Sequence, residues 1–182
     1  MLDLANEGLV EPVRNRGFRI VPMEDRDLDE ILELRLLLEV PSAGRVAGSL
    51  QPEDIERLSR HVDELEQAAE DKDLAAYLTA DHAFHLALLQ PLGNRRLLDL
   101  VARLRDQQRL YGLPGMVDST AFGATAAEHR AILDAVAAGE SALAEELMRR
   151  HLRHTRGVWA GWQEPAEQHP ATLGVPDRST GS

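Results

Sequence analysis

Residues 74–89, LAAYLTADHAFHLALL, place a carboxylate and an imidazole inside an apolar helical stripe. Tyr77, Asp81, His85 and Leu88 recur at helical spacing, so they share one face of the predicted helix. That face is otherwise apolar, which predicts that it points into a protein core. Polar groups buried there are unfavourable unless a partner satisfies them. A divalent metal ion is one partner that could satisfy both groups at once.

Helical patterns continue on both sides of this stretch. We expect one helix from residue 25, which Pro41 should break or kink, and another from about 52 to 71. Further helices are expected from Asn94 onward, over about 124–138, and from 141 to about 162. Leucine and alanine dominate, and aromatic residues make up only 4% of the chain. The pattern predicts an all-α fold, an antiparallel bundle of about six helices.

Two more histidines lie on apolar helical faces. His129 shares a face with Ile132 and Val136, and His151 shares one with Leu147. Bundle cores commonly build metal sites from side chains on facing helices. Each histidine could instead be a core residue with its own hydrogen bond. We nevertheless predict one metal site, whose four ligands come from three helices: Asp81, His85, His129 and His151.

The ligand types narrow the choice of ion. Imidazole suits zinc and nickel, and a carboxylate extends the choice toward manganese. The chain has no cysteine, which excludes thiolate ligands and makes a purely structural zinc site an unfavoured interpretation. We therefore expect a divalent metal ion as cofactor, with zinc first and manganese or nickel as alternatives.

Two arginines are candidates for binding an anion. Arg35 lies among leucines in ELRLLLE (33–39), so part of its side chain is expected to be buried. Its guanidinium could clamp a carboxylate ligand, or it could form a helical ion pair with Glu39 four residues later. Arg105 is a weaker candidate for the same ligand-binding role.

Charge and hydropathy limit the classes of partner. The net charge of −11 argues against a broad nucleic-acid-binding surface. Residues 13–19, VRNRGFR, nevertheless hold three arginines and no acid, and they lie in a predicted β-hairpin that closes at Gly17. No apolar run is long enough to span a membrane, and the N-terminus lacks the features of a signal peptide. A cytoplasmic location is expected.

Four motifs, taken together, resemble a known family. They are ELRLLLE (33–39), DHAFHLALLQPLGN (81–94), EHRAILDAVAAGE (128–140) and MRRHLRH (148–154). Their order and spacing resemble the FCD effector domain of the FadR subgroup of GntR-type transcription regulators. The resemblance implies an all-α bundle that holds a divalent metal through Asp81, His85, His129 and His151. It also implies a small organic acid as ligand and a homodimer that binds operator DNA.

The first residues extend the resemblance. Residues 2–23 are similar to the end of a GntR winged helix-turn-helix, with Arg14, Arg16 and Arg19 in its wing as candidate DNA contacts. We expect a partial winged helix-turn-helix over 1–22, an FCD domain over 23–163 and a disordered tail over 164–182. Most of the recognition helix is missing from this pattern, and it is the element that contacts base edges in the major groove.

The sequence therefore predicts a ligand-responsive, DNA-binding transcription regulator and not an enzyme. Two alternatives stay open. One is a metal-dependent enzyme on a helical bundle, which would need an open coordination position and a general base. Glu128 is a poor candidate for that base, because it lies about 100° around the helix from His129. The other is a truncated ligand-binding or dimerisation module that does not bind DNA alone.

Overall fold

The computed structural model describes residues 10–13, 17–20, 24–116 and 121–159. Within these ranges two short strands precede six α-helices and one 3-10 turn. The elements are β1 (Val10–Val13), β2 (Gly17–Ile20), α2 (Asp25–Val46), α3 (Pro52–Asp71), α4 (Leu74–Leu89), η1 (Gln90–Leu92), α5 (Arg95–Met116), α6 (Ala121–Ala137) and α7 (Ser141–Trp159). The predicted all-α bundle is confirmed.

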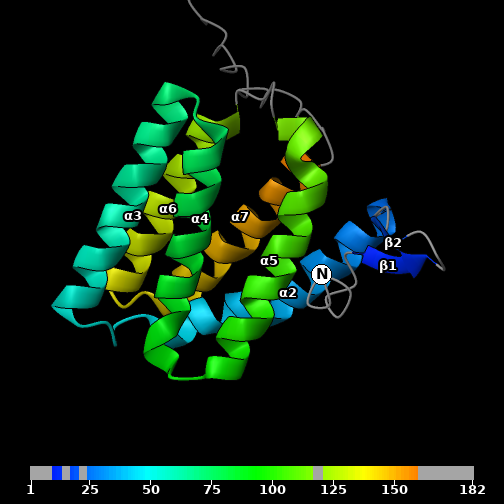
Figure 1. The fold of residues 1–182 in the computed structure, drawn as a ribbon. Helices are drawn as coiled ribbons and strands as arrows, with labels where there is room; N and C mark the ends of the chain where they lie inside the picture. The colour runs from blue at the N-terminus through cyan, green and yellow to red at the C-terminus, as the bar shows by residue number, and fades with distance from the viewer. Residues whose placement is uncertain (1–9, 14–16, 21–23, 117–120, 160–182) are drawn as a thin grey trace, which may run out of the picture.

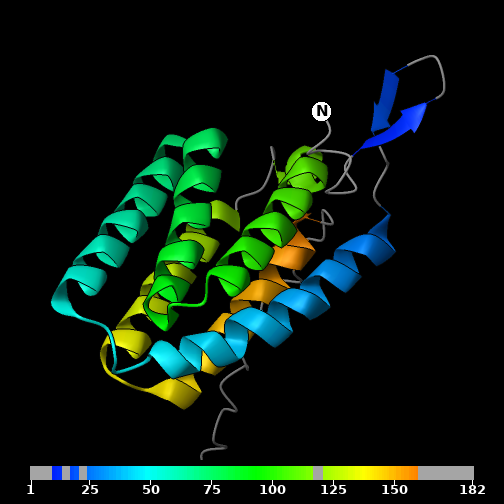
Figure 2. The same ribbon diagram turned by 60° about the horizontal axis from the view of Figure 1, so that its bottom comes forward.

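The helices form a bundle with α2 along one side. Helices α3, α4, α6 and α7 run side by side, and α2 packs along α7 (Figures 1 and 2). Helix α5 contacts α2, α4 and α7. The β1–β2 hairpin stands beyond the N-terminal end of α2, away from α3 (Figure 2). The interior that holds the histidines is therefore built by α2, α4, α5, α6 and α7.

The main apolar cluster of the core is built by α2, α3, α4, α6 and α7, and α5 buries Val101 and Leu104 as well. On α3, the residues Leu58, Val62 and Leu65 recur at helical spacing and are fully buried, so they form one apolar face toward the core. Phe84 is the largest fully buried side chain on α4. The other helices add small and branched residues to the same cluster: Val40, Ala43, Val46, Ala126, Ile132, Leu133, Val136, Ala144, Met148 and Leu152.

The sequence predicts that Pro41 breaks or kinks the first long helix, and the predicted break is wrong. Helix α2 continues through Pro41 to Val46. Proline has no N–H, so it leaves the carbonyl of Leu37 without its helical partner. Pro41 and Leu37 both lie on the exposed face, where water can satisfy that carbonyl. The helix beyond the proline is fixed by packing, since Ala43 and Val46 are fully buried.

Most other helix boundaries agree with the sequence, because the capping residues are present. Asn94 opens α5, and its Oδ1 accepts a hydrogen bond from the Leu97 N–H at 3.2 Å. Two ends differ. Helix α5 runs to Met116, although residues 112–120 have the composition of a loop, and α6 begins at Ala121, before 124. Composition is a weak guide at a helix end, where the preceding turns already favour continuation.

Two glycines let the turns after α2 and α6 meet. Gly48 and Gly139 both have positive φ, +73° and +76°. A Cβ on Gly48 would lie only 3.2 Å from the Cα of Gly139. The Gly48 N–H also donates to the carbonyl of Val136 at 3.0 Å. This contact ties the end of α2 to the end of α6.

The hairpin predicted before the bundle is present as a two-stranded antiparallel ribbon. Val10 pairs with Ile20, and Val13 pairs with Gly17. Residues 1–9, 14–16 and 160–182 lie outside the described residues, and so do the predicted helix end at 1–7 and the predicted disordered tail. Among the described helices, none has both the length and the hydropathy to cross a membrane.

Candidate metal centre

Four side chains predicted as metal ligands meet in the interior of the bundle. Asp81 and His85 come from α4, His129 from α6 and His151 from α7. One oxygen or nitrogen from each lies within 4.8 Å of the others. Asp81 is 8% exposed, and the three histidines are at most 1% exposed. The structure thus brings together all four residues, while their role as ligands stays a prediction.

Helix geometry explains why Asp81 and His85 meet the other two. Residues four apart lie above one another on a helix, so both side chains of α4 point toward α6 and α7. Phe84 fills the space beside them and contacts the rings of His85 and His129 edge-on, with centroids 5.6 and 4.9 Å away. This packing limits the rotation of both imidazole rings.

The Nδ1 atom of each imidazole lies on the side away from the cluster centre and contacts an oxygen acceptor. His85 Nδ1 donates to Oε2 of Glu39 at 2.5 Å. His129 Nδ1 donates to the backbone carbonyl of Thr125 at 2.7 Å, and His151 Nδ1 donates to Oε2 of Glu128 at 2.9 Å. A carbonyl or an ionised carboxylate can only accept, so the proton of each ring sits on Nδ1. In a neutral ring with its proton on Nδ1, Nε2 carries a lone pair, and in all three rings this atom faces the centre of the cluster.

The charges around the cluster keep its carboxylates ionised. Burial alone would raise the pKa of Glu39, but the nearby Arg35 and His85 outweigh it and hold that pKa well below its usual range. Burial likewise opposes ionisation of Asp81, yet Arg105 keeps its pKa well below the ordinary value. Arg105 Nη2 donates directly to Oδ2 of Asp81. Only Oδ1 of Asp81 is left to face the histidines.

The same burial keeps the imidazoles of His85 and His151 neutral. Desolvation, with Arg105 as the next cause, holds the pKa of His85 well below its usual value. Desolvation and the neighbouring His129 lower the pKa of His151 to about 4. Neutral imidazole is the form that binds a metal ion.

Two of the distances between facing atoms match those between ligands of one bound cation, and all four ligand atoms lie within 4.8 Å of one another. His85 Nε2 lies 3.2 Å from His151 Nε2, and His129 Nε2 lies 3.1 Å from Asp81 Oδ1. The His85 Nε2 to Asp81 Oδ1 distance is 3.7 Å. Ligands bonded to one ion at about 2.0–2.1 Å lie roughly 3.0–3.4 Å apart. Four lone pairs that converge without protons between them repel one another, and a cation at their centre removes that repulsion.

The two predicted anion-binding arginines lie beside this cluster. Arg35 is 3% exposed, and it donates from Nε to Glu39 and from Nη1 to Gln108, both at 2.6 Å. Arg105 is 4% exposed and bonds Asp81. Arg35 Nη2, Arg105 Nε and Arg105 Nη1 are buried and have no hydrogen-bond partner among the described residues. An unsatisfied buried donor costs about 1–3 kcal/mol, so these atoms suit an anionic ligand.

The arrangement involves residues that the sequence patterns did not single out. Glu39 entered only as the ion-pair partner of Arg35, and Glu128 only as a poor general base. The offset of Glu128 from His129 directs it toward α7, where its two oxygens contact His151 and His154. The position of Glu128 next to a core histidine was the available signal in the sequence. Its hydrogen-bond partner, His151, lies 23 residues away on another helix, so the sequence alone did not reveal the contact.

Of the three arginines predicted to contact DNA, the structure describes the position of Arg19 alone. Arg19 is in β2, opposite Glu11 in the register of the hairpin, and Arg14 and Arg16 lie outside the described residues. Two histidines outside the predicted sites do not contribute to the cluster: Nδ1 of His61 lies 3.1 Å from the acceptor Oε2 of Glu64 on the surface of α3. His82 points to another side of α4, near Asp106.

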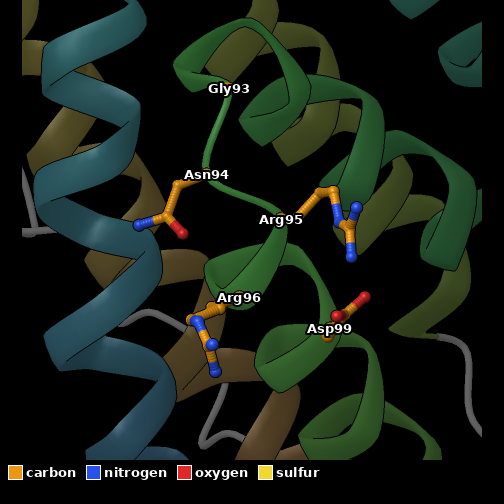
Figure 3. Close-up of a pocket in the computed structure, with 5 residues that line it drawn as sticks. All are labelled: Gly93, Asn94, Arg95, Arg96 and Asp99. Carbon is orange, nitrogen blue, oxygen red and sulfur yellow. The ribbon is translucent and has the colours of Figure 1, made fainter.

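A surface hollow at the start of α5 is separate from the metal cluster. It has a volume of about 520 Å³ and is lined by five residues, Gly93, Asn94, Arg95, Arg96 and Asp99. Arg95 and Asp99 lie on one side of it, and Asn94 and Arg96 lie on the other (Figure 3). All five are exposed, and none of the buried cluster residues contributes to its lining. The hollow is therefore an exposed surface feature, separate from the buried group of Asp81, His85, His129 and His151.

Comparisons with known proteins point to one family. The model of the FCD domain matches residues 30–154. The chain is similar to an HTH-type transcriptional regulator in an unstable DNA locus of Streptomyces ambofaciens, with 31% identity over 82% of this chain and 63% of that protein. It is also 31% identical to the HTH-type transcriptional regulator LutR of Bacillus subtilis, over 78% of this chain and 66% of LutR. The chain spans just under two thirds of the length of these relatives.

Solved structures share the fold. The Escherichia coli protein McbR/YncC superposes with a TM-score of 0.80, covering 87% of this chain and 80% of that one. The two sequences are 19% identical, so this likeness concerns the fold alone. The region matched by the FCD domain model, residues 30–154, includes all four clustered residues.

Proposed function

Because this chain belongs to the FCD domain family, we propose that it is the effector part of a transcription regulator. Its similarity to proteins named as HTH-type transcriptional regulators supports a regulator and disfavours the metal-dependent enzyme. In this proposal residues 1–22 are the end of a winged helix-turn-helix, residues 23–163 are the effector domain, and residues 164–182 are a disordered tail.

The effector domain binds one divalent metal ion through Asp81, His85, His129 and His151. The observation that supports this is the convergence of four buried ligand atoms, one from each residue, which all lie within 4.8 Å of one another. Zinc is the first expectation, since neutral imidazoles and one carboxylate suit it, and manganese and nickel are alternatives. When bound, the ion would supply a Lewis-acidic centre to an oxygen of the effector.

The effector is a small organic acid. Arg35 and Arg105 present buried donors without partners beside the cluster, and guanidinium groups recognise carboxylates through paired hydrogen bonds. The charge of the acid would satisfy these donors in a site that excludes water. A ligand of the same size without acceptor oxygens would leave the donors unsatisfied.

Ligand binding controls DNA binding by a homodimer. Arg14, Arg16 and Arg19 in the wing contact DNA phosphates or a groove edge, which positions a regulator on the duplex without specifying sequence. A two-fold dimer matches the two half-sites of an operator. The acid changes DNA affinity to the extent that it binds one arrangement of the dimer better than another.

Metal content tests the proposal first. Elemental analysis of purified wild type should find about one ion per chain, and His129→Ala should lose it. His61→Ala is the matched control, because His61 lies on the surface of α3 and should retain the ion. An ion-free wild type, with no response of its thermal melt to added zinc, manganese or nickel, would show that the four residues are hydrogen-bonded core groups.

A further inference from the structure

Glu39 uses both of its carboxylate oxygens inside the core. The residue is fully buried on α2. Oε1 accepts from Nε of Arg35 at 2.6 Å, and Oε2 accepts from Nδ1 of His85 at 2.5 Å. The contact to His85 joins α2 to α4 across 46 residues of sequence. A continuous hydrogen-bonded chain therefore runs from Arg35 through Glu39 to the cluster.

We propose that Glu39 is a positioning residue that locks His85 in its metal-binding tautomer, and that Arg35 in turn locks Glu39. This inference rests on the proposed metal site. Metal-binding histidines depend on the group behind them, since that group decides which ring nitrogen carries the proton. With an acceptor behind it, His85 keeps its proton on Nδ1 and turns the lone pair of Nε2 toward the ion.

The substitution Glu39→Gln, which replaces the carboxylate with an amide, tests whether His85 requires an acceptor oxygen at its Nδ1. Glutamine has one acceptor oxygen and one donor nitrogen. If the oxygen faces His85, the amide nitrogen faces Nε of Arg35 and two donors oppose each other. If the oxygen faces Arg35, the amide nitrogen faces Nδ1 of His85, which must then lose its proton. The proton moves to Nε2, where it blocks metal binding.

Glu128 supplies the matched comparison, because it also bridges two groups but only one of them is constrained. Its Oε2 accepts from His151 and its Oε1 contacts Nδ1 of His154 at 2.8 Å. The side chain of His154 is 16% exposed. In Glu128→Gln the amide nitrogen can face His154, whose ring can carry its proton on the solvent side. His151 then keeps an acceptor behind it and keeps its metal-binding tautomer.

The contrast predicts a specific order of zinc affinities, measured by competition with a chromophoric chelator. Glu39→Gln should bind zinc about 100-fold more weakly than wild type, and Glu128→Gln at most about 10-fold more weakly. The double variant Glu39→Gln/Arg35→Met removes the donor that opposes the amide. It should recover at least about tenfold of the lost affinity, and a residue that acts only by filling space would not show this rescue.

The outcomes separate this inference from the proposed metal site. A wild type that binds no zinc overturns the metal site and the inference with it. If the wild type binds zinc, three results would overturn the role of Glu39 alone. The first is a zinc affinity of Glu39→Gln equal to that of wild type, and the second is an affinity of Glu128→Gln as low as that of Glu39→Gln. The third is a double variant that recovers none of the lost affinity.

A second measurement covers the case in which Glu39→Gln does not fold. Nitrogen-15 chemical shifts of the histidine rings report the tautomer of His85 directly in the chelator-treated wild type. We expect a protonated Nδ1 and an unprotonated Nε2. A proton on Nε2 would overturn the inference without use of any variant.

Discussion

His85 and His151 face each other through their Nε2 atoms at 3.2 Å, while the Nδ1 of each ring is tied to a glutamate on a different helix. Both imidazoles thus point lone pairs at the same place. This relationship makes the centre of the bundle rich in electron donors, so we expect a bound cation to stabilise the fold.

Removing the ion should destabilise the fold. At an ion concentration 100 times the dissociation constant, binding adds about 2.7 kcal/mol to stability, which corresponds to roughly 5–10 °C in Tm for a chain of this size. Differential scanning fluorimetry with and without chelator measures the shift. His151→Ala should melt at the same temperature in both conditions, and a chelator effect of wild-type size in this variant would contradict the assignment of His151.

Carboxylate binding should depend on Arg35. Acetate, succinate and citrate, tested one by one on the zinc-loaded protein, should include at least one that raises Tm in wild type. That increase should vanish in Arg35→Met, because the buried guanidinium and its unpaired Nη2 are lost. Arg26→Met is the control, since its side chain is 84% exposed and pairs with Glu30. Equal protection of Arg35→Met and wild type would remove Arg35 from the ligand site.

Acid should destabilise the metal-free protein before its carboxylates titrate. The folded-state pKa of His151 is about 4, below the unfolded value of 6.5, so the unfolded chain takes up protons first as pH falls. Stability is therefore highest above pH 6.5 and declines toward pH 4, by at most about 1.4 kcal/mol per pH unit for this histidine. The lowered pKa values of Glu39 and Asp81 add a further loss at lower pH.

Urea unfolding in the presence of a chelator, at several pH values between 7 and 5, measures this decline in the free energy of unfolding. His151→Gln removes the titrating group and should reduce the slope. A wild-type stability that stays constant over this range would contradict a lowered histidine pKa.

The contact between Gly48 and Gly139 should make Gly48→Ala costly. An added Cβ meets the Cα of Gly139 at 3.2 Å, and the positive φ is strained for alanine in addition. We expect a loss of about 2 kcal/mol or more in the free energy of unfolding. Gly93→Ala separates the two causes, since Gly93 has φ +66° and no atom within 4 Å of an added Cβ. Its loss should be near 1 kcal/mol. Equal losses in the two variants would show that the contact is not tight.

The helices and the inward direction of the candidate ligands were predictable from local patterns. Asp81 and His85 lie four residues apart within an apolar stripe, and that spacing alone puts them on one buried face. His129 and His151 follow the same reasoning on their own helices. Pro41 marks the limit of such reasoning, because a proline on the exposed side of a packed helix does not end it.

Helical periodicity and residue type predicted the four inward-facing ligands of one metal site, and the resemblance to a known family implied the same four residues. Neither predicted which residues accept a hydrogen bond from the Nδ1 atoms of the histidines. Glu39 and Glu128 looked like ordinary charged helix residues, and their contacts cross 46 and 23 residues of sequence.

Periodicity and residue chemistry were sufficient for the bundle and for the burial of its histidines, because both depend on interactions within one helix turn. The proton positions, the converging lone pairs and the unpaired arginine donors depend on how α2, α4, α5, α6 and α7 pack. A hydrogen bond needs atoms from different helices within about 3 Å. Helical spacing specifies which face a residue occupies, but the residue opposite it is set by the packing of the whole bundle.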